Sequence, residues 1–350
     1  MKSISVNTAQ QYNVLIGSNL LTDAGTYIKE IHATCKAAII SDSNVWPLYG
    51  SELERTLNSA GFETASSVFP AGESSKNANT YLEILNFLAE HKITRSDLII
   101  ALGGGVVGDI SGFAAATFLR GISYIQIPTS LLAMVDSSVG GKTAIDLPAG
   151  KNLVGAFKQP SLVLCDVSLL HTLPKNQFID GCAEVIKYGI LYDSELVHYL
   201  LNSGTDFDLE TVIAKCITFK RDVVQEDEFD TGVRQKLNLG HTIGHGIEAG
   251  SNYQITHGCA VAAGMAIVTR AAVSKKLCDP AVYSVLKALL LKFGLPIQTD
   301  YTADVLYHSA LSDKKRSGGN VNLIVPKAIG HCELMKIPVA ELKSFIEEGL

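Results

Sequence analysis

Three short segments, far apart in the chain, supply one carboxylate and three imidazoles. They read GCAEVIKYG at 181–189, LNLGHTIGHGIE at 237–248 and THG at 256–258. Catalytic zinc sites keep three nitrogen, oxygen or sulfur ligands and leave one position for water or substrate, and two histidines with one glutamate are a recurring set. Glu184, His241 and His257 match that set, so the sequence predicts a metal site with these three ligands.

The segment around His241 also contains His245, four residues further on. Side chains at this spacing are neighbours on one helical face, so spacing alone makes both histidines candidate ligands, and an ordinary helix could carry the same pair without a metal. Asn238 and Glu248 recur on the same face. Glycine costs about 1 kcal/mol in a helix interior, so we expect some other group to approach the backbone closely at Gly240, Gly244 and Gly246.

The string RQKLNLGHTIGHGIE at 234–248 resembles the signature of the 3-dehydroquinate synthase family. These enzymes of the shikimate pathway, which leads to aromatic amino acids, cyclise a seven-carbon keto sugar acid phosphate. Further segments are similar to the family in the same order: 103–113, 128–146, 150–160, 181–189 and 312–315. The resemblance covers essentially the whole chain and implies a member of the sugar phosphate cyclase group.

Composition narrows the class of protein. A length of 350 residues favours about two domains. The net charge of −6 argues against a nucleic-acid partner, which would require a basic surface. Residues 1–17 lack the apolar run of a signal peptide, and seven cysteines fit reduced thiols, so we expect a cytoplasmic protein. The uncharged stretch 249–269 contains polar residues, and we expect a buried helix there and no membrane partner.

Strand and helix patterns alternate in the first half of the chain. Buried strands are expected at 36–41 and 97–102, with helices near 48–60 and 80–91, a pattern that predicts a parallel sheet. From about Leu170 helical stretches dominate: 178–202, 208–225, 239–249, 257–277, 280–293 and 302–311. Segments 320–326 and 331–337 flank Gly330 and predict a small hairpin.

These patterns and the resemblance together predict the domain organisation. We expect an α/β Rossmann-like dinucleotide-binding domain at 1–173, followed by a mainly α-helical metal- and substrate-binding domain at 174–350. The whole would then have the dehydroquinate synthase-like fold.

Gly103, Gly105 and Gly108 form a GxGxxG motif between a strand and a helix, the context of a dinucleotide loop. The acidic ribose partner usual about twenty residues downstream is missing, so a standard Rossmann assignment is doubtful. The resemblance places the ribose contacts upstream, at Asp42, Glu73 and Lys76; without it, these are ordinary loop charges. It also implies that the NAD site contains Gly104, Gly105, Asp109, Thr129, Ser130, Asp136, Lys142, Lys151 and Thr172.

A cluster of basic residues falls in or beside the same motifs. Exposed lysines usually only aid solubility, but several of these stand in apolar or glycine-rich surroundings, where a buried cation needs a partner. The resemblance implies that a small anionic sugar-acid phosphate is that partner. Its phosphate would face Lys142, Asn152, His245, Arg120 and Lys314 or Lys315, and its carboxylate would face Lys220, Arg234 and Asn238, with Lys187 in the same cluster.

The resemblance implies two cofactors, NAD and Zn²⁺ or Co²⁺. NAD would oxidise a hydroxyl transiently, so that phosphate leaves by β-elimination before the hydride returns, the ring opens and an aldol addition closes the product. The metal would act as Lewis acid and template. His245 would relay protons and would not bind the metal. Cys182 and Cys259 stand two residues from predicted ligands and either approach the metal or are small buried hydrophobes.

Three alternatives stay open from the sequence. Another sugar phosphate cyclase would share NAD and zinc but lack a carboxylate on its substrate, which Lys220 and Arg234 argue against. A polyol dehydrogenase would accumulate NADH. A degenerate scaffold would have lost ligands, and none is missing. Finally, Arg120 is most simply a surface charge, but the resemblance implies that it reaches the neighbouring subunit's phosphate in a homodimer.

Overall fold

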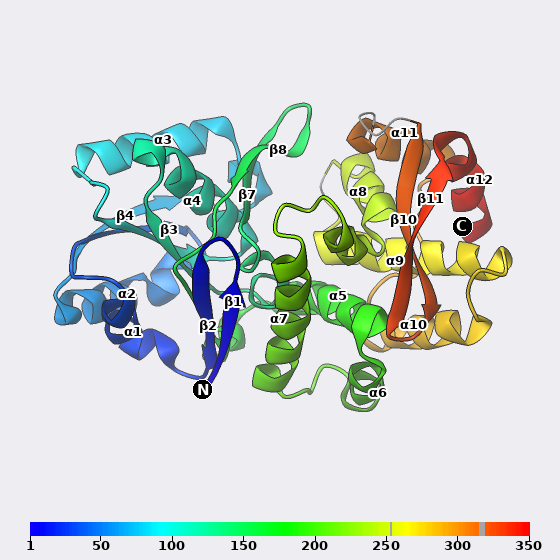
Figure 1. Ribbon diagram of the computed structural model, residues 1–350, viewed down its shortest axis with the longest axis horizontal. Helices are drawn as coiled ribbons and strands as arrows, with labels where there is room; N and C mark the ends of the chain where they lie inside the picture. Colours follow the sequence, from blue (N-terminus) through cyan, green and yellow to red (C-terminus); the bar gives the residue numbers. More distant parts are fainter. Residues whose placement is uncertain (253, 315–318) are drawn as a thin grey trace. The chain divides into compact units, whose positions relative to one another are not determined.

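The computed structural model describes residues 1–252, 254–314 and 319–350, which form two compact units (Figure 1). Unit 1 comprises Met1–Pro174 and Leu209–Phe229, and unit 2 comprises Lys175–Asp208 and Asp230–Leu350. The chain therefore leaves unit 1, returns to it for one helix and leaves again. The expected division into domains 1–173 and 174–350 stays a prediction, because compactness does not show which part folds independently.

Unit 1 is built on a seven-stranded sheet in the order β1-β2-β9-β6-β5-β3-β4. Its strands are β1 (Lys2–Asn7), β2 (Gln11–Gly17), β3 (Lys36–Asp42), β4 (Glu63–Phe69), β5 (Leu98–Gly103), β6 (Ser123–Pro128) and β9 (Leu162–Asp166). Only the β1–β2 pair is antiparallel among these described strands. Every residue of β5, LIIALG, is buried, as is typical of a central parallel strand covered on both faces.

Helices cover both faces of this sheet, with α1 and α2 on one side and α3 and α4 on the other (Figure 1). The helices of unit 1 are α1 (Ala24–Ile31), α2 (Trp46–Ala60), α3 (Ala78–Glu90), α4 (Gly105–Thr117) and α7 (Leu209–Glu226). Shorter helical turns are η1 (Leu20–Asp23), η2 (Glu73–Ser75), η3 (Phe118–Arg120), η4 (Ala133–Ser137) and η5 (Val167–Thr172). An antiparallel hairpin of β7 (Lys142–Leu147) and β8 (Gly150–Phe157) stands outside the main sheet.

The order of the strands creates a switch point between β3 and β5. The chain passes from β3 through α2 to β4 on one side, whereas β5 continues through α4 to β6 on the other. In open α/β sheets, ligands bind at such a point, beyond the carboxyl ends of the strands. Here those ends are Asp42 and Gly103.

Unit 2 is mainly helical. It contains α5 (Lys175–Tyr192), α6 (Ser194–Ser203), η6 (Val233–Asn238), α8 (His241–Gly250), α9 (His257–Ser274), α10 (Pro280–Lys292), α11 (Ala303–Lys314), β10 (Asn320–Ala328), β11 (His331–Pro338) and α12 (Val339–Gly349). The expected single helix over 178–202 is two helices, because Asp193 stops α5 and caps α6 by accepting hydrogen bonds from Glu195 N and Leu196 N. The hairpin around Gly330 forms as β10 and β11.

Helix α9 lies at the centre of unit 2. By length and composition alone it could cross a membrane, but 72% of its 18-residue apolar window is buried. Buried residues of α8, α10, α11, α12 and the β10–β11 hairpin belong to the same core as those of α9. It is therefore the buried helix that the sequence predicts at this place.

The approach of α9 explains two of the three glycines at which a close contact was expected, Gly240 just before α8 and Gly244 within it. A Cβ at Gly240 would lie 2.7 Å from Val261 O, and one at Gly244 would lie 3.1 Å from Val261 Cα. Conversely, a Cβ at Gly264 of α9 would lie 2.1 Å from Gly240 O. At Gly246 the nearest atom would be at 3.4 Å, an ordinary contact, so close approach was a wrong expectation for that residue.

Candidate functional site

Unit 2 brings together one side chain from each of three helices. Glu184 comes from α5, His241 begins α8 and His257 begins α9. The Nε2 atom of His241 lies 3.6 Å from Glu184 Oε1, and that of His257 lies 3.4 Å from the same oxygen. The side chain of Glu184 is 1% exposed, and neither of its oxygens makes a hydrogen bond of ordinary geometry within the described residues.

These spacings fit a metal ion. With metal–ligand distances of about 2.0–2.1 Å, a tetrahedral site separates its ligand atoms by roughly 3.3–3.4 Å. The potential ligand atoms of Glu184, His241 and His257 all lie within 4.8 Å of one another. The buried Glu184 carboxylate has an ion pair with Lys187 but no hydrogen bond of ordinary geometry, and a metal ion would compensate its charge further. The donor set therefore fits a divalent cation such as Zn²⁺ or Co²⁺.

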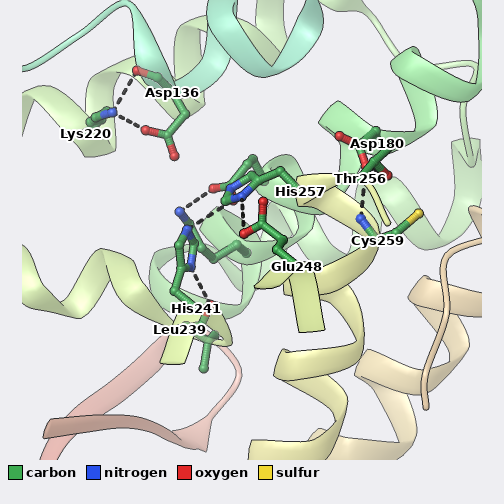
Figure 2. A network of polar contacts seen from close by, with 11 residues as sticks. Asp136, Asp180, Lys220, Leu239, His241, Glu248, Thr256, His257 and Cys259 are labelled. Atoms are coloured by element: carbon green, nitrogen blue, oxygen red, sulfur yellow. Dashed lines mark hydrogen bonds and ion pairs between the residues drawn. The ribbon is translucent and has the colours of Figure 1, made fainter. Parts of the chain in front are cut away.

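The second nitrogen of each imidazole is held by an acceptor. Nδ1 of His241 lies 3.2 Å from Leu239 O, and Nδ1 of His257 lies 3.3 Å from Glu248 Oε2 (Figure 2). Since a carbonyl or carboxylate oxygen only accepts, each Nδ1 carries the proton and each Nε2 faces Glu184. Metal-ligating histidines are usually oriented in this way.

The charges around the two imidazoles differ. Burial and the nearby Lys187 ammonium lower the pKa of His241 well below its usual range, so this ring is neutral and ready to ligate. Burial alone would also lower the pKa of His257, but the nearby Glu184 and Glu248 carboxylates raise it to about 10. A metal ion must displace that proton, as metal binding to histidine generally does.

Two further predicted residues lie beside these three. Lys187 is 1% exposed and forms an ion pair with Glu184 Oε2. The His245 ring is exposed, with its centroid 5.5 Å from that of His241 and 6.4 Å from that of His257. His245 also belongs to a second possible donor set, with Glu248 and His257. The structure thus brings His245 near the predicted ligands, and the two possible donor sets share His257.

In unit 1 the glycine-rich segment lies at the switch point. Gly104 is the N-cap of α4 and has no side chain to cap the free N–H groups of the first turn. A helix N-terminus of this kind favours anions such as a pyrophosphate. At Gly108 a Cβ would lie 2.7 Å from Gln126 Oε1, so the third glycine of the motif permits close packing of α4 on the sheet. Asp42 lies at the end of the adjacent strand β3.

A network of charges connects η2, α4 and the β7–β8 hairpin. Lys76 Nζ lies 2.6 Å from Asp109 Oδ2 and donates to Asn152 Oδ1 at 2.6 Å, while Lys151 Nζ lies 3.2 Å from Glu73 Oε1. Burial alone would lower the pKa of Lys76, but the Asp109 and Glu73 carboxylates raise it above its usual range. The structure therefore brings five predicted residues into one network.

The other predicted residues of unit 1 are more dispersed. Lys220 of α7 pairs with Asp136 and also donates to its backbone oxygen at 2.7 Å (Figure 2). The Thr172 hydroxyl shares a hydrogen bond with Tyr49. Thr129 is buried, Ser130 is half-buried, and Lys142 is exposed at the start of β7. Arg120 is exposed and, like Asn152, has a positive φ, a strained conformation for a residue other than glycine.

In unit 2, Arg234 is 2% exposed within η6, and Asn238 is half-buried at its end. Lys314 is the last residue of α11, but its side chain lies outside the described part of the chain, as does all of Lys315. The prediction for these two lysines therefore stays a prediction.

Sequence reasoning missed three acidic residues. Glu248 was placed on the helical face of the histidines but given no role. Asp146, whose Oδ1 accepts from Asn152 N at 2.8 Å, belongs to the network of Lys76. Asp180 of α5 accepts from Cys259 N at 3.0 Å and from the Thr256 hydroxyl. Only the spacing of Asp180 four residues before Glu184 could have indicated that the two share a face.

Sequence comparison identifies relatives over nearly the whole chain. The family described as 3-dehydroquinate synthase N-terminal matches residues 66–180, and the family described as 3-dehydroquinate synthase C-terminal matches residues 181–316. The 3-dehydroquinate synthase of Streptococcus suis (strain 05ZYH33) is 45% identical over 343 residues, which cover 96% of this chain and 97% of that protein. That of Enterococcus faecalis (strain ATCC 47077 / OG1RF) is 42% identical, with 99% and 98% covered.

Solved structures confirm the expected fold class. A 2-deoxy-scyllo-inosose synthase complexed with carbaglucose-6-phosphate, NAD⁺ and Co²⁺ has a TM-score of 0.89 and 28% identity over 100% of both chains. A 2-epi-5-epi-valiolone synthase from Streptomyces hygroscopicus subsp. jinggangensis 5008, with NAD⁺ and Zn²⁺ bound, has a TM-score of 0.90 and 25% identity over 99% of this chain and 98% of that one. Glycerol dehydrogenase from Schizosaccharomyces pombe, at 0.63 and 18% over 96% and 88%, shows the fold alone.

Proposed function

Because the chain belongs to the 3-dehydroquinate synthase family, it is a phosphate-eliminating cyclase that needs NAD and a divalent metal, and we propose how its residues divide the work. The reaction converts 3-deoxy-D-arabino-heptulosonate 7-phosphate to 3-dehydroquinate plus phosphate. When bound, NAD would serve as a reversible hydride acceptor for the substrate carbon that bears a hydroxyl; the ketone formed there would make the neighbouring C–H acidic until the hydride is returned. A divalent metal supplies a Lewis acid for substrate oxygens.

The metal would be held by Glu184, His241 and His257. One observation carries this assignment: two Nε2 atoms lie 3.4 and 3.6 Å from one buried glutamate oxygen, each on a ring whose Nδ1 is held by an acceptor. Lys187, buried beside Glu184, would place positive charge next to the substrate oxygens. His245 would move protons between the substrate and solvent, since it is exposed beside the candidate ligands.

The cofactor would lie at the switch point of unit 1. Asp42, Glu73 and Lys76 would bind the ribose side, and the N-terminus of α4 would bind the pyrophosphate. The other proposed contacts are Gly104, Gly105, Asp109, Thr129, Ser130, Asp136, Lys142, Lys151 and Thr172. The network of Lys76 with Asp109 and Asn152 supports a polar, preorganised edge at this place.

The substrate's two anionic ends would be bound by different groups. The phosphate would be bound by Lys142, Asn152, Arg120, His245 and Lys314 or Lys315. Lys220, Arg234 and Asn238 would face the carboxylate. Lys220 and Arg234 are 6% and 2% exposed, and Lys220 pairs with Asp136, so a substrate carboxylate would bind to cations that the protein already holds in place. The carboxylate set separates this function from cyclases whose sugar phosphate substrates lack a carboxylate.

Phosphate release from the seven-carbon keto acid phosphate tests the proposal directly. Activity should require NAD and a divalent metal, disappear with a chelator and leave no accumulated NADH. Glu184→Gln and His241→Ala should lose metal and activity together, whereas His245→Ala should lose activity and keep its metal. Steady NADH formation in proportion to product would instead establish a polyol dehydrogenase, and loss of zinc by His245→Ala would contradict the ligand assignment.

We also propose a cytoplasmic homodimer. All seven cysteines are free thiols, which agrees with a reducing compartment. Arg120 would reach the neighbouring subunit's phosphate; the residue is exposed and has a positive φ, a conformation that is uncommon for residues other than glycine. Mixing inactive Arg120→Ala and His245→Ala subunits should restore about a quarter of the activity, because half of the dimers are mixed and half of their sites are whole. No recovery after confirmed subunit exchange would contradict a shared site.

A further inference from the structure

Glu248 is a buried carboxylate that the ligand set does not use. It is 2% exposed and lies in α8, seven residues after His241, so both side chains are on the same face of the helix. Its Oε2 atom lies 3.3 Å from Nδ1 of His257 (Figure 2). A charge buried to this degree is retained only with partners, and one of its partners is the imidazole of a predicted ligand.

Asp180 acts on the same ligand through the backbone. It lies in α5, four residues before Glu184, and its Oδ1 accepts from Cys259 N at 3.0 Å and from the Thr256 hydroxyl (Figure 2). Thr256 is the N-cap residue of α9, but its own side chain makes no capping hydrogen bond. Asp180 therefore caps α9 from a neighbouring helix, where a carboxylate also complements the positive end of the helix dipole.

The contact between α5 and the start of α9 is too close to admit a side chain at residue 258. A Cβ at Gly258, the residue after His257, would lie 1.9 Å from Asp180 O. The first turn of α9 is thus pressed against the backbone of α5. Asp180 thus contacts the first turn of α9 beside His257, and Glu248 contacts the ring of His257.

We propose that Asp180 and Glu248 are positioning residues for His257, an inference that rests on the proposed metal site. Helices α5 and α8 each supply one predicted metal ligand and also one carboxylate that would position His257, the third ligand. Helix α5 carries Glu184 and Asp180, and α8 carries His241 and Glu248. Asp180 fixes the backbone position at the start of α9, from which the His257 side chain extends. Glu248 fixes the tautomer and the rotation of the His257 ring so that Nε2 faces Glu184.

A rival role for Glu248 is direct ligation, since it forms a second possible donor set with His245 and His257. The two roles differ in what an amide can replace. The side-chain oxygen of glutamine still accepts a hydrogen bond from Nδ1, whereas a neutral amide is a poor substitute for a carboxylate ligand. Glu248→Gln therefore separates positioning from ligation.

The test measures Co²⁺ and Zn²⁺ affinity of the full-length protein by competition with a chelator, together with the visible spectrum of the Co²⁺ form. Loss of an orienting partner typically weakens metal binding by about 10- to 100-fold, so we expect this range for Glu248→Ala and a much smaller loss for Glu248→Gln. Both should keep a tetrahedral Co²⁺ spectrum. For Asp180→Ala we expect a loss of about tenfold, with Asp180→Asn close to the unmodified protein.

Asp279→Ala is the matched control for Asp180→Ala. Asp279 caps α10 by accepting from Ala281 N at 2.8 Å and is not among the residues near the ligands. The Asp279→Ala substitution should lower the unfolding temperature of the protein and leave its metal affinity unchanged. Unchanged affinity in Glu248→Ala and Asp180→Ala would overturn the inference, as would a Glu248→Gln variant with lost metal and an altered spectrum. Failure of the unmodified protein to bind metal through His257 would instead refute the proposed site.

Discussion

Gly264 faces Gly240 where α9 crosses α8, and replacing it with alanine tests what holds the two imidazoles in place. A Cβ at residue 264 would lie 2.1 Å from Gly240 O and 3.0 Å from Gly244 N. Carbon atoms keep about 3.5 Å from such neighbours. Both obstacles are backbone atoms, so no side-chain rotation relieves the clash. The two helices must separate by roughly 1 Å or more, as the same contact limit requires.

Such a separation is large for a metal site. His241 adjoins Gly240, and His257 begins the helix that carries Gly264. Metal–ligand distances tolerate only about ±0.2 Å, and a misplacement of about 1 Å can cost 10²-fold in activity. We expect Gly264→Ala to bind Zn²⁺ at least about 10²-fold more weakly. Overpacking should also lower the free energy of unfolding by about 1–3 kcal/mol.

Gly246→Ala is the control within α8, at a position that faces α11. Its Cβ would lie 3.4 Å from the nearest atom, Leu306 O, and the residue does not need a positive φ. Alanine should therefore raise the free energy of unfolding by about 0.5–1 kcal/mol and leave metal affinity unchanged. Urea unfolding of the metal-free protein and chelator competition measure both quantities. Equal effects of the two substitutions, or an unaffected Gly264→Ala, would refute the reasoning.

Three further predictions concern other parts of the chain. Burial alone would raise the pKa of Asp97, but hydrogen bonds from Thr94 and from Lys36 N hold it below 3.8. Asp97→Asn should therefore lower the free energy of unfolding by about 1–3 kcal/mol at pH 7. This difference should shrink in an acid titration as the pH falls below 3.8 and passes the pKa of the folded state. Gly108→Ala should weaken NAD binding in a fluorescence titration, since its Cβ would lie 2.7 Å from Gln126 Oε1. Metal removal by a chelator should abolish phosphate release and leave the far-ultraviolet circular dichroism unchanged, because none of the three ligands belongs to the apolar core of unit 2; re-added metal should restore activity.

The candidate metal site could be proposed from the sequence because its donors are few in kind and unusual in type. Glutamate and two histidines form a recognised set wherever they meet, and the glycines beside His241 indicated a tight helix contact before its partner was known. Spacing could not choose between His241 and His245, since both lie on one helical face. In the structure, Nδ1 of His241 lies 3.2 Å from Leu239 O, a feature of the folded backbone that the spacing does not show.

Other elements carried a local signal that the sequence reading did not use. The N-terminal strands β1 and β2 alternate buried and exposed residues, as a half-covered antiparallel pair should; in β1, Ile4 and Val6 are buried and the residues beside them are exposed. Helix α12 repeats buried residues at Leu342, Phe345, Ile346 and Gly349, the spacing of an amphipathic helix. In both cases the period was present in the sequence.

Asp180 and Asp146 gave no such signal. An isolated aspartate is usually a solvated charge or a cap for its own helix. Asp180 instead caps a helix that begins 77 residues later, and Asp146 holds Asn152 within a hairpin outside the main sheet. Roles of this kind arise only when distant segments meet, so sequence spacing cannot indicate them.

The two candidate sites depend on different physics, and this difference is itself testable. The proposed nucleotide site depends on glycine residues and on the free N–H groups at the N-terminus of α4. The proposed metal site depends instead on three specific donor atoms within unit 2. Because no ligand of the metal belongs to unit 1, Glu184→Gln should lose Zn²⁺ while its NAD affinity, measured by fluorescence titration, equals that of the unmodified protein. A parallel loss of NAD affinity would show that cofactor binding requires the metal and that the sites cannot be treated separately.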